Sequence, residues 1–244
     1  MAKSHDRAPA PVGKGTPAET SSGTGIDAFL KRVRAIECPV PPGRRSRLMF
    51  ALDATMSRQP TWDTACKLQG EMFLEAQAIG GLDVQLTYFR GSSECRTSRW
   101  VSEPAALAAL MEKIDCRGGH TQIGRVLKHA CRETERAKVH ALVYVGDAME
   151  EIAGEVCATA RDLGLRGVPA FMFQEGSDRD AEKTFRDIAR LTRGAYGRFD
   201  AGAAHELREL LCAVAAYAAG GLKALGDLSA RRNTGAMRLL EQMK

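Results

Sequence analysis

The chain has 244 residues, of which 44% are hydrophobic and 27% charged, and its net charge is +5. This length and composition are typical of a soluble protein with one core, and no apolar run approaches the roughly 20 residues that span a bilayer. Aromatic residues make up only 6% of the chain and the positive charge is dispersed, which disfavours a nucleic-acid-binding surface. We therefore expect no nucleic-acid partner and no membrane contact.

The seven cysteines are dispersed along the chain, odd in number and never arranged as Cys-x-x-Cys. Disulfide frameworks and zinc sites both need tighter patterns, so we expect reduced thiols. The first residues lack the apolar segment of a secretory signal. Together these features predict a cytoplasmic protein.

The first 45 residues lack the pattern of a folded core. Residues 1–24 are rich in Ala, Pro, Gly, Ser and Thr without periodic apolar positions, which predicts a disordered tail. Residues 26–36 carry apolar side chains at helical spacing, and the CPVPPGRR that follows breaks such a helix. We therefore assign residues 25–45 to a short helix and a linker.

From residue 46 onward, predicted strands alternate with predicted helices. The strands are expected at residues 48–52, 83–89, 140–145, 168–173 and 195–199, and the helices at 62–79, 102–115, 121–137, 152–163, 180–191 and 205–217. A polar stretch between them, GSSECRTSRWVS, predicts an antiparallel edge strand.

This alternation predicts one doubly wound α/β domain over residues 46–218. Its central sheet is mostly parallel, with helices on both faces and one antiparallel edge strand. Residues 219–244 follow as a Gly-hinged extension that ends in a basic amphipathic helix.

Polar side chains follow two of the predicted strands and open one of the helices. Asp53, Thr55 and Ser57 come after the first core strand in FALDATMS, Asp147 follows a later strand in VYVGDAMEE, and Thr121 opens a helix in GGHTQIGRVL. Open α/β sheets bind ligands at the carboxyl ends of their strands, so we expect these five oxygen donors at one edge. Such hard donors suit Mg²⁺, with Mn²⁺ as a substitute, and argue against zinc.

The three motifs, in this order, resemble the metal-ion-dependent adhesion site of a von Willebrand factor A domain, of the intracellular bacterial type. The family's D-x-S-x-S stretch reads DATMS here, with Thr55 in place of the first Ser. Its T-x-I-G-x-x-L signature reads TQIGRVL, and its later Asp, usually preceded by Gly, is Asp147 after Gly146.

The resemblance implies a role for each of these residues. Thr55 and Ser57 would bind the metal directly, and Thr121, Asp53 and Asp147 either directly or through water. Gly118, Gly119 and Gly146 would support the loops, and the first two would let the loop with Thr121 approach closely.

The resemblance also implies a non-enzymatic module whose Mg²⁺ accepts a Glu or Asp side chain from a partner protein. An alternative is a metal-dependent phosphoryl-transfer enzyme of the phosphatase type, but such an enzyme needs a second acid two residues after Asp53, where Thr55 stands. A third hypothesis is a domain without metal that acts only as an interaction surface. No glycine-rich nucleotide-binding motif is present.

Several neighbouring residues have two interpretations each. Arg58 either steers an anionic ligand or pairs with Glu150 and Glu151, two acids that we expect to be exposed to solvent. Trp100 is expected on the edge strand, where it is a candidate partner contact.

Overall fold

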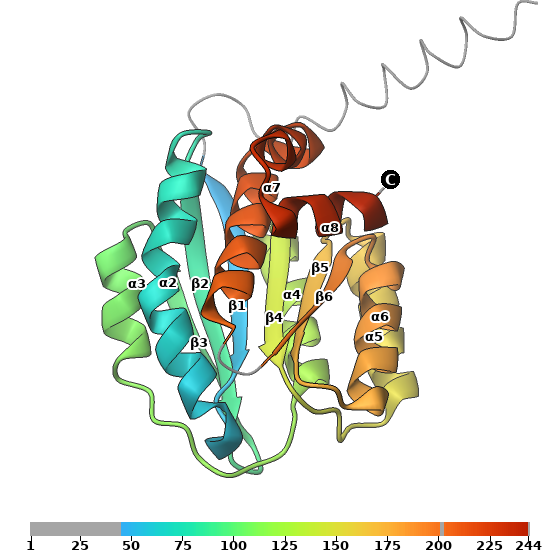
Figure 1. The fold of residues 1–244 in the computed structure, drawn as a ribbon. Coiled ribbons are helices and arrows are strands. Elements are labelled where there is room, and N and C mark those ends of the chain that lie inside the picture. The colour runs from blue at the N-terminus through green and yellow to red at the C-terminus, as the bar shows by residue number, and fades with distance from the viewer. Residues whose placement is uncertain (1–44, 201–202, 244) are drawn as a thin grey trace, which may run out of the picture. The chain divides into compact units, whose positions relative to one another are not determined.

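The computed structural model describes residues 45–200 and 203–243. The expected tail, the helix at 26–36 and all but the last residue of the linker lie outside the described residues. Six strands form one sheet in the order β3-β2-β1-β4-β5-β6 (Figure 1). They are β1 (Ser46–Asp53), β2 (Leu82–Arg90), β3 (Glu94–Val101), β4 (Ala141–Gly146), β5 (Ala170–Glu175) and β6 (Ala195–Phe199).

The sheet has the predicted strand directions. β3 pairs antiparallel with β2 at one edge, and the other neighbouring strands pair in parallel. The prediction of a mostly parallel sheet with one antiparallel edge strand is therefore confirmed. Predicted element boundaries differ from the observed ones mainly by a few residues, with one larger difference in the last long helix.

The central strand β1 is buried on both sides. Leu48, Phe50 and Leu52 belong to the core on one face, and Met49 and Ala51 to the core on the other, because successive side chains of a strand alternate. This burial explains the continuous apolar run of the strand.

Helices cover both faces of the sheet (Figure 1). One face is covered by α2 (Gln59–Gln77), α3 (Pro104–Met111), α7 (Ala204–Ala230) and α8 (Thr234–Gln242), and the other by α4 (Ile123–Arg136), α5 (Ala153–Leu165) and α6 (Arg179–Leu191).

The helix expected at 205–217 continues to Ala230 as α7, through a kink at Gly221, whose φ is 67°. Leu225 in its second half and Leu239 in α8 are fully buried in the same core as the sheet. The described part of the expected extension, residues 219–243, therefore packs on the α/β core.

By length and composition alone α7 could cross a membrane, although we expect no membrane contact from the sequence. Of its most apolar stretch, 61% is buried inside the protein. A helix that packs along a sheet has an apolar composition like that of a helix that crosses a membrane. This explains why α7 has such a composition although no membrane contact is expected.

The strand order also determines where a ligand can bind. From β1 the chain moves outward to β2 and β3 and then returns to β4 on the other side of β1. The connections from β1 and from β4 therefore leave in opposite directions, and open α/β sheets bind ligands at such a switch point. The predicted site residue Asp53 is the last residue of β1, and Asp147 directly follows β4.

Candidate metal site

The first motif forms a tight turn at the end of β1. Asp53 is 3% exposed, and its Oδ1 accepts a hydrogen bond from the Thr55 N–H at 2.8 Å. The chain then enters the short helix η1 (Met56–Arg58), and the Thr55 Oγ1 lies 3.4 Å from the Ser57 Oγ. The alternation of Asp53, Thr55 and Ser57 thus brings their oxygens to one place.

The loop after β4 contacts this turn directly. The Ser57 hydroxyl donates a hydrogen bond to the Asp147 Oδ2 at 3.1 Å. Residues 90 positions apart in the sequence therefore meet at the switch point. The contact joins the first and third predicted motifs.

The electrostatics of this group centre on Asp53. Burial raises the pKa of the Asp53 carboxyl to about 6, and the negative charge of Asp147 adds to the rise. Hydrogen bonds from Thr55 and the positive charge of Arg58 act in the opposite direction. A cation at this place would favour the ionised carboxylate, which burial disfavours.

Thr121 lies in the neighbouring loop, before α4. Its N–H donates to the Glu150 Oε2 at 2.9 Å, and its Oγ1 accepts a hydrogen bond from the Glu150 N–H at 3.0 Å. Within residues 45–200 and 203–243, no hydrogen bond joins Thr121 to the other four predicted ligands. The structure therefore brings Asp53, Thr55, Ser57 and Asp147 into one hydrogen-bonded group and links Thr121 to the loop that carries Asp147.

Two of the three predicted supporting glycines have a steric reason. A Cβ at Gly119 would lie 2.3 Å from the backbone nitrogen of Gly91, and one at Gly146 would lie 2.6 Å from the Tyr144 hydroxyl. A Cβ at Gly118 would meet nothing within 4 Å. Close packing thus explains why positions 119 and 146 hold glycine, but it does not explain the glycine at position 118.

Arg58 has a different partner from the one expected. It is 2% exposed, and its Nη1 contacts the carboxylate of Glu175 at the end of β5 and lies 3.9 Å from the Asp147 Oδ2. The hydroxyl of Thr61 also donates to Glu175. Arg58 therefore pairs with Glu175 rather than with Glu150 or Glu151. In the sequence, Glu175 stands out only as an acid at the end of a buried strand. It lies 117 residues from Arg58, so no local pattern identifies it as the partner of Arg58.

Glu151 and Trp100 also serve the fold itself. The half-buried Glu151 carboxylate accepts hydrogen bonds from the Ile123 and Gly124 N–H groups, the latter at 3.0 Å, and so caps α4. The expectation of a solvent-exposed Glu151 is wrong because α4 begins beside it. The Trp100 Nε1 donates to Glu133 at 3.0 Å, so this indole is engaged within the domain.

The donors that gather here fit a hard cation. Within the described residues, no cluster of three or more His, Cys, Asp or Glu side chains could hold a metal ion. A metal bound by this group would therefore need the hydroxyls as well as the two carboxylates. Such an all-oxygen set suits Mg²⁺ better than zinc. The adjacent Arg58 partly offsets the attraction for a cation.

Solved structures share this fold. A von Willebrand factor type A protein from Catenulispora acidiphila aligns with a TM-score of 0.56 and 17% identity, over 70% of this chain and 43% of its own. The SpRpn10 VWA domain aligns with a TM-score of 0.51 and 12% identity, over 66% of this chain and 90% of its own. This chain has the von Willebrand factor A fold.

A third structure of this fold holds a metal. It is proximal thread matrix protein 1 from the mussel byssus with a zinc-occupied MIDAS motif, with a TM-score of 0.56 and 15% identity, over 79% of this chain and 52% of its own. The chain thus spans 43% of the Catenulispora protein and about half of the mussel protein. No protein-family model and no curated protein sequence matches the chain.

Proposed function

We propose that this protein is a non-enzymatic, cytoplasmic interaction module that binds Mg²⁺, or Mn²⁺, through Asp53, Thr55, Ser57, Thr121 and Asp147. In this proposal the metal accepts a Glu or Asp side chain from a partner protein. The observation that carries the proposal is the contact of Ser57 with Asp147, which joins two motifs from adjacent strands at the switch point.

The chemistry of the group supports binding rather than catalysis. Two carboxylates balance the charge of a divalent ion, and the neutral hydroxyls leave it able to attract a further anion. Position 55, where a phosphatase would need its second acid, holds a threonine whose hydroxyl lies beside Ser57. The von Willebrand factor A fold adds to this support, because the mussel protein of the same fold holds a metal in its MIDAS motif.

Thermal melting tests the metal site. A ligand that binds the folded state stabilises it by about 2.7 kcal/mol at a concentration of 100 times its Kd, so millimolar Mg²⁺ or Mn²⁺ should raise Tm. Ser57→Ala should lose most of this rise and Asp53→Ala all of it. Asp227→Ala, which removes an exposed carboxylate from α7, should keep the full rise. A wild-type Tm that does not respond to millimolar metal would refute the proposal.

Partner capture tests the second half of the proposal. Proteins retained on the immobilised full chain in Mg²⁺ should elute with a chelator and should not bind the Ser57→Ala variant. If the wild type and the Ser57→Ala variant both bound the same proteins in the presence of chelator, the metal would not mediate the interaction.

A further inference from the structure

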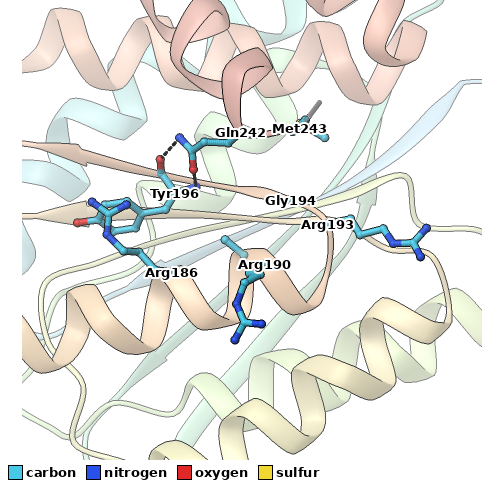
Figure 2. A pocket seen from close by; sticks show the side chains of 8 residues that line it. Arg186, Arg190, Arg193, Gly194, Tyr196, Gln242 and Met243 are labelled. Carbon is cyan, nitrogen blue, oxygen red and sulfur yellow. Dashed lines mark hydrogen bonds between the residues drawn. The ribbon is translucent and has the colours of Figure 1, made fainter.

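A cavity of about 440 Å³ lies away from the metal site, between α6, β6 and α8. Arg186, Arg190, Arg193, Tyr196 and Gln242 are among its lining residues (Figure 2). This volume is within the range of ligand-binding pockets. The cavity lies beside the start of the edge strand β6, whereas the candidate metal site lies at the carboxyl ends of β1 and β4.

The three arginines are spaced four and three residues apart, and each one is exposed to solvent. The Arg186 guanidinium lies 4.2 Å from the centre of the Tyr196 ring and 2.8 Å from Glu182, and Arg190 lies 2.9 Å from Asp187. Exposed pairs of this kind are weak, so an incoming anion can replace the acid of the same helix. Among the described residues, the Arg193 guanidinium has no acceptor.

The backbone of Arg193 is unusual. Its φ is 56°, in the left-handed region, one residue past Thr192, the C-cap of α6, where glycine is the favoured residue. The Gly194 N–H donates to the Ala189 carbonyl at 2.8 Å, which closes the helix end. A left-handed backbone costs an arginine energy that it does not cost a glycine. The favourable charge at a helix C-terminus partly offsets this cost. Arg193 is also among the residues that line the cavity.

The geometry indicates what kind of ligand fits. Figure 2 shows Arg186 lying along the Tyr196 ring while Arg190 and Arg193 point away in different directions, so a compact anion cannot reach all three guanidinium groups. An extended chain with several carboxylates can. Arginine also pairs well with carboxylates, through two parallel hydrogen bonds.

The edge strand itself is already covered. The Gln242 Oε1 accepts a hydrogen bond from the Tyr196 N–H at 2.9 Å, and its Nε2 donates to the Tyr196 carbonyl at 2.8 Å. A peptide therefore cannot add to β6 as a further strand at this position, and recognition must use side chains.

We propose that this cavity, with Arg193 as its principal contact, binds an acidic segment of a partner protein through at least two carboxylates. The site is separate from the metal site and does not depend on a bound metal. It would give the module a second contact surface, on the β6 edge.

The proposal can be tested by measuring the binding of a labelled hexaglutamate peptide to the full chain by fluorescence anisotropy. The buffer contains EDTA, so that the carboxylates of the peptide cannot bind through a metal. Binding should weaken with added salt. Arg193→Gly should weaken it about tenfold, because a hydrogen-bonded charge is lost. Hexaglutamine should not bind, and Ser57→Ala should bind hexaglutamate like the wild type.

Arg232→Gly is the matched control. Arg232 also has a positive φ, 65°, one residue past Arg231, the C-cap of α7, but it lies at the far end of α8 from the cavity. Both glycine variants should raise Tm, whereas only Arg193→Gly should weaken peptide binding. Equal peptide affinity of the two variants would overturn the proposal. It would also be overturned if pyrophosphate bound to the wild type through Arg193 while hexaglutamate did not bind.

Discussion

At the scale of single residues, the most consequential contact is the buried pair of Arg58 and Glu175. It joins the turn after β1 to the end of β5, beside the candidate metal ligand Asp147. Glu175 is only 8% exposed, so this acid depends on Arg58 for its counter-charge.

Arg58→Met should therefore destabilise the protein by about 3 kcal/mol, because it leaves the Glu175 charge buried without its partner. Urea unfolding monitored by circular dichroism measures this loss. In the double variant Arg58→Met with Glu175→Gln, the buried charge is gone and much of the stability should return. Equal losses in the single and double variants would contradict this explanation.

A second residue-scale prediction concerns Glu133, whose carboxylate accepts hydrogen bonds from Arg47, Trp100 and Arg136 at 2.9–3.0 Å. Burial raises the pKa of Glu133, but the hydrogen bond from Trp100 and the nearby positive charges outweigh it and hold the pKa below the ordinary 4.5. A lowered folded-state pKa means that the stabilisation is present above about pH 4.5 and is lost as the pH falls below it.

Glu133→Gln should therefore be less stable than the wild type at pH 7, by about 2 kcal/mol, and the difference should shrink below pH 4.5. Urea titrations at pH 7 and pH 3.5 measure both differences. A difference that does not change with pH would show that the charge of Glu133 is not what stabilises the fold.

At the scale of elements, α8 is held by core side chains such as Leu239 and by hydrogen bonds at its two ends. At its start, the Asn233 Oδ1 accepts a hydrogen bond from the Ala236 N–H at 2.7 Å, and the Glu209 carboxylate accepts one from the Thr234 N–H at 2.6 Å. At its end, Gln242 covers the backbone of Tyr196. α8 therefore shields part of the β6 edge, which would otherwise be open to pairing with another chain.

Loss of the helix cap should loosen this element. Asn233→Ala should cost about 1 kcal/mol, because the first turn of α8 loses its side-chain acceptor. Limited proteolysis should then cut the region of α8 faster than in the wild type. Asn233→Asp keeps an acceptor oxygen and should match the wild type, and cleavage of both variants at the same increased rate would argue against capping.

At the scale of the whole molecule, residues 45–200 and 203–243 form one sheet with two covered faces and contain no disulfide bond. The six cysteines in the described residues are free, and three of them are buried. Such thiols contribute as small apolar side chains. The Tm of the protein should therefore be the same with and without a reducing agent, as differential scanning calorimetry can measure. A Tm that falls on reduction would indicate a disulfide.

Local sequence was sufficient to predict much of the architecture. The apolar run of β1 and the helical spacing of apolar residues reflect which faces of these elements are buried. Buried positions recur with the period of the strand or helix, so they can be recognised in the sequence. The order of Asp53, Thr55 and Ser57 after a buried strand likewise predicted oxygens at one edge of the sheet. The extent of α7 was missed because glycines normally weaken a helix, whereas here the core continues past the kink at Gly221.

The sequence by itself thus determined the α/β class, the direction of the strands and the residue types at their carboxyl ends. Each strand and helix is recognisable from its own local pattern, and the alternation of the two implies a mostly parallel sheet. Only the tertiary structure decided that Ser57 reaches Asp147, that Thr121 is bonded to Glu150 and that Arg58 pairs with Glu175. The arginine-lined cavity is also decided by the tertiary structure, because it forms where α6, β6 and α8 meet. These contacts join distant residues, and their partners are chosen by the packing of the whole sheet rather than by any local pattern.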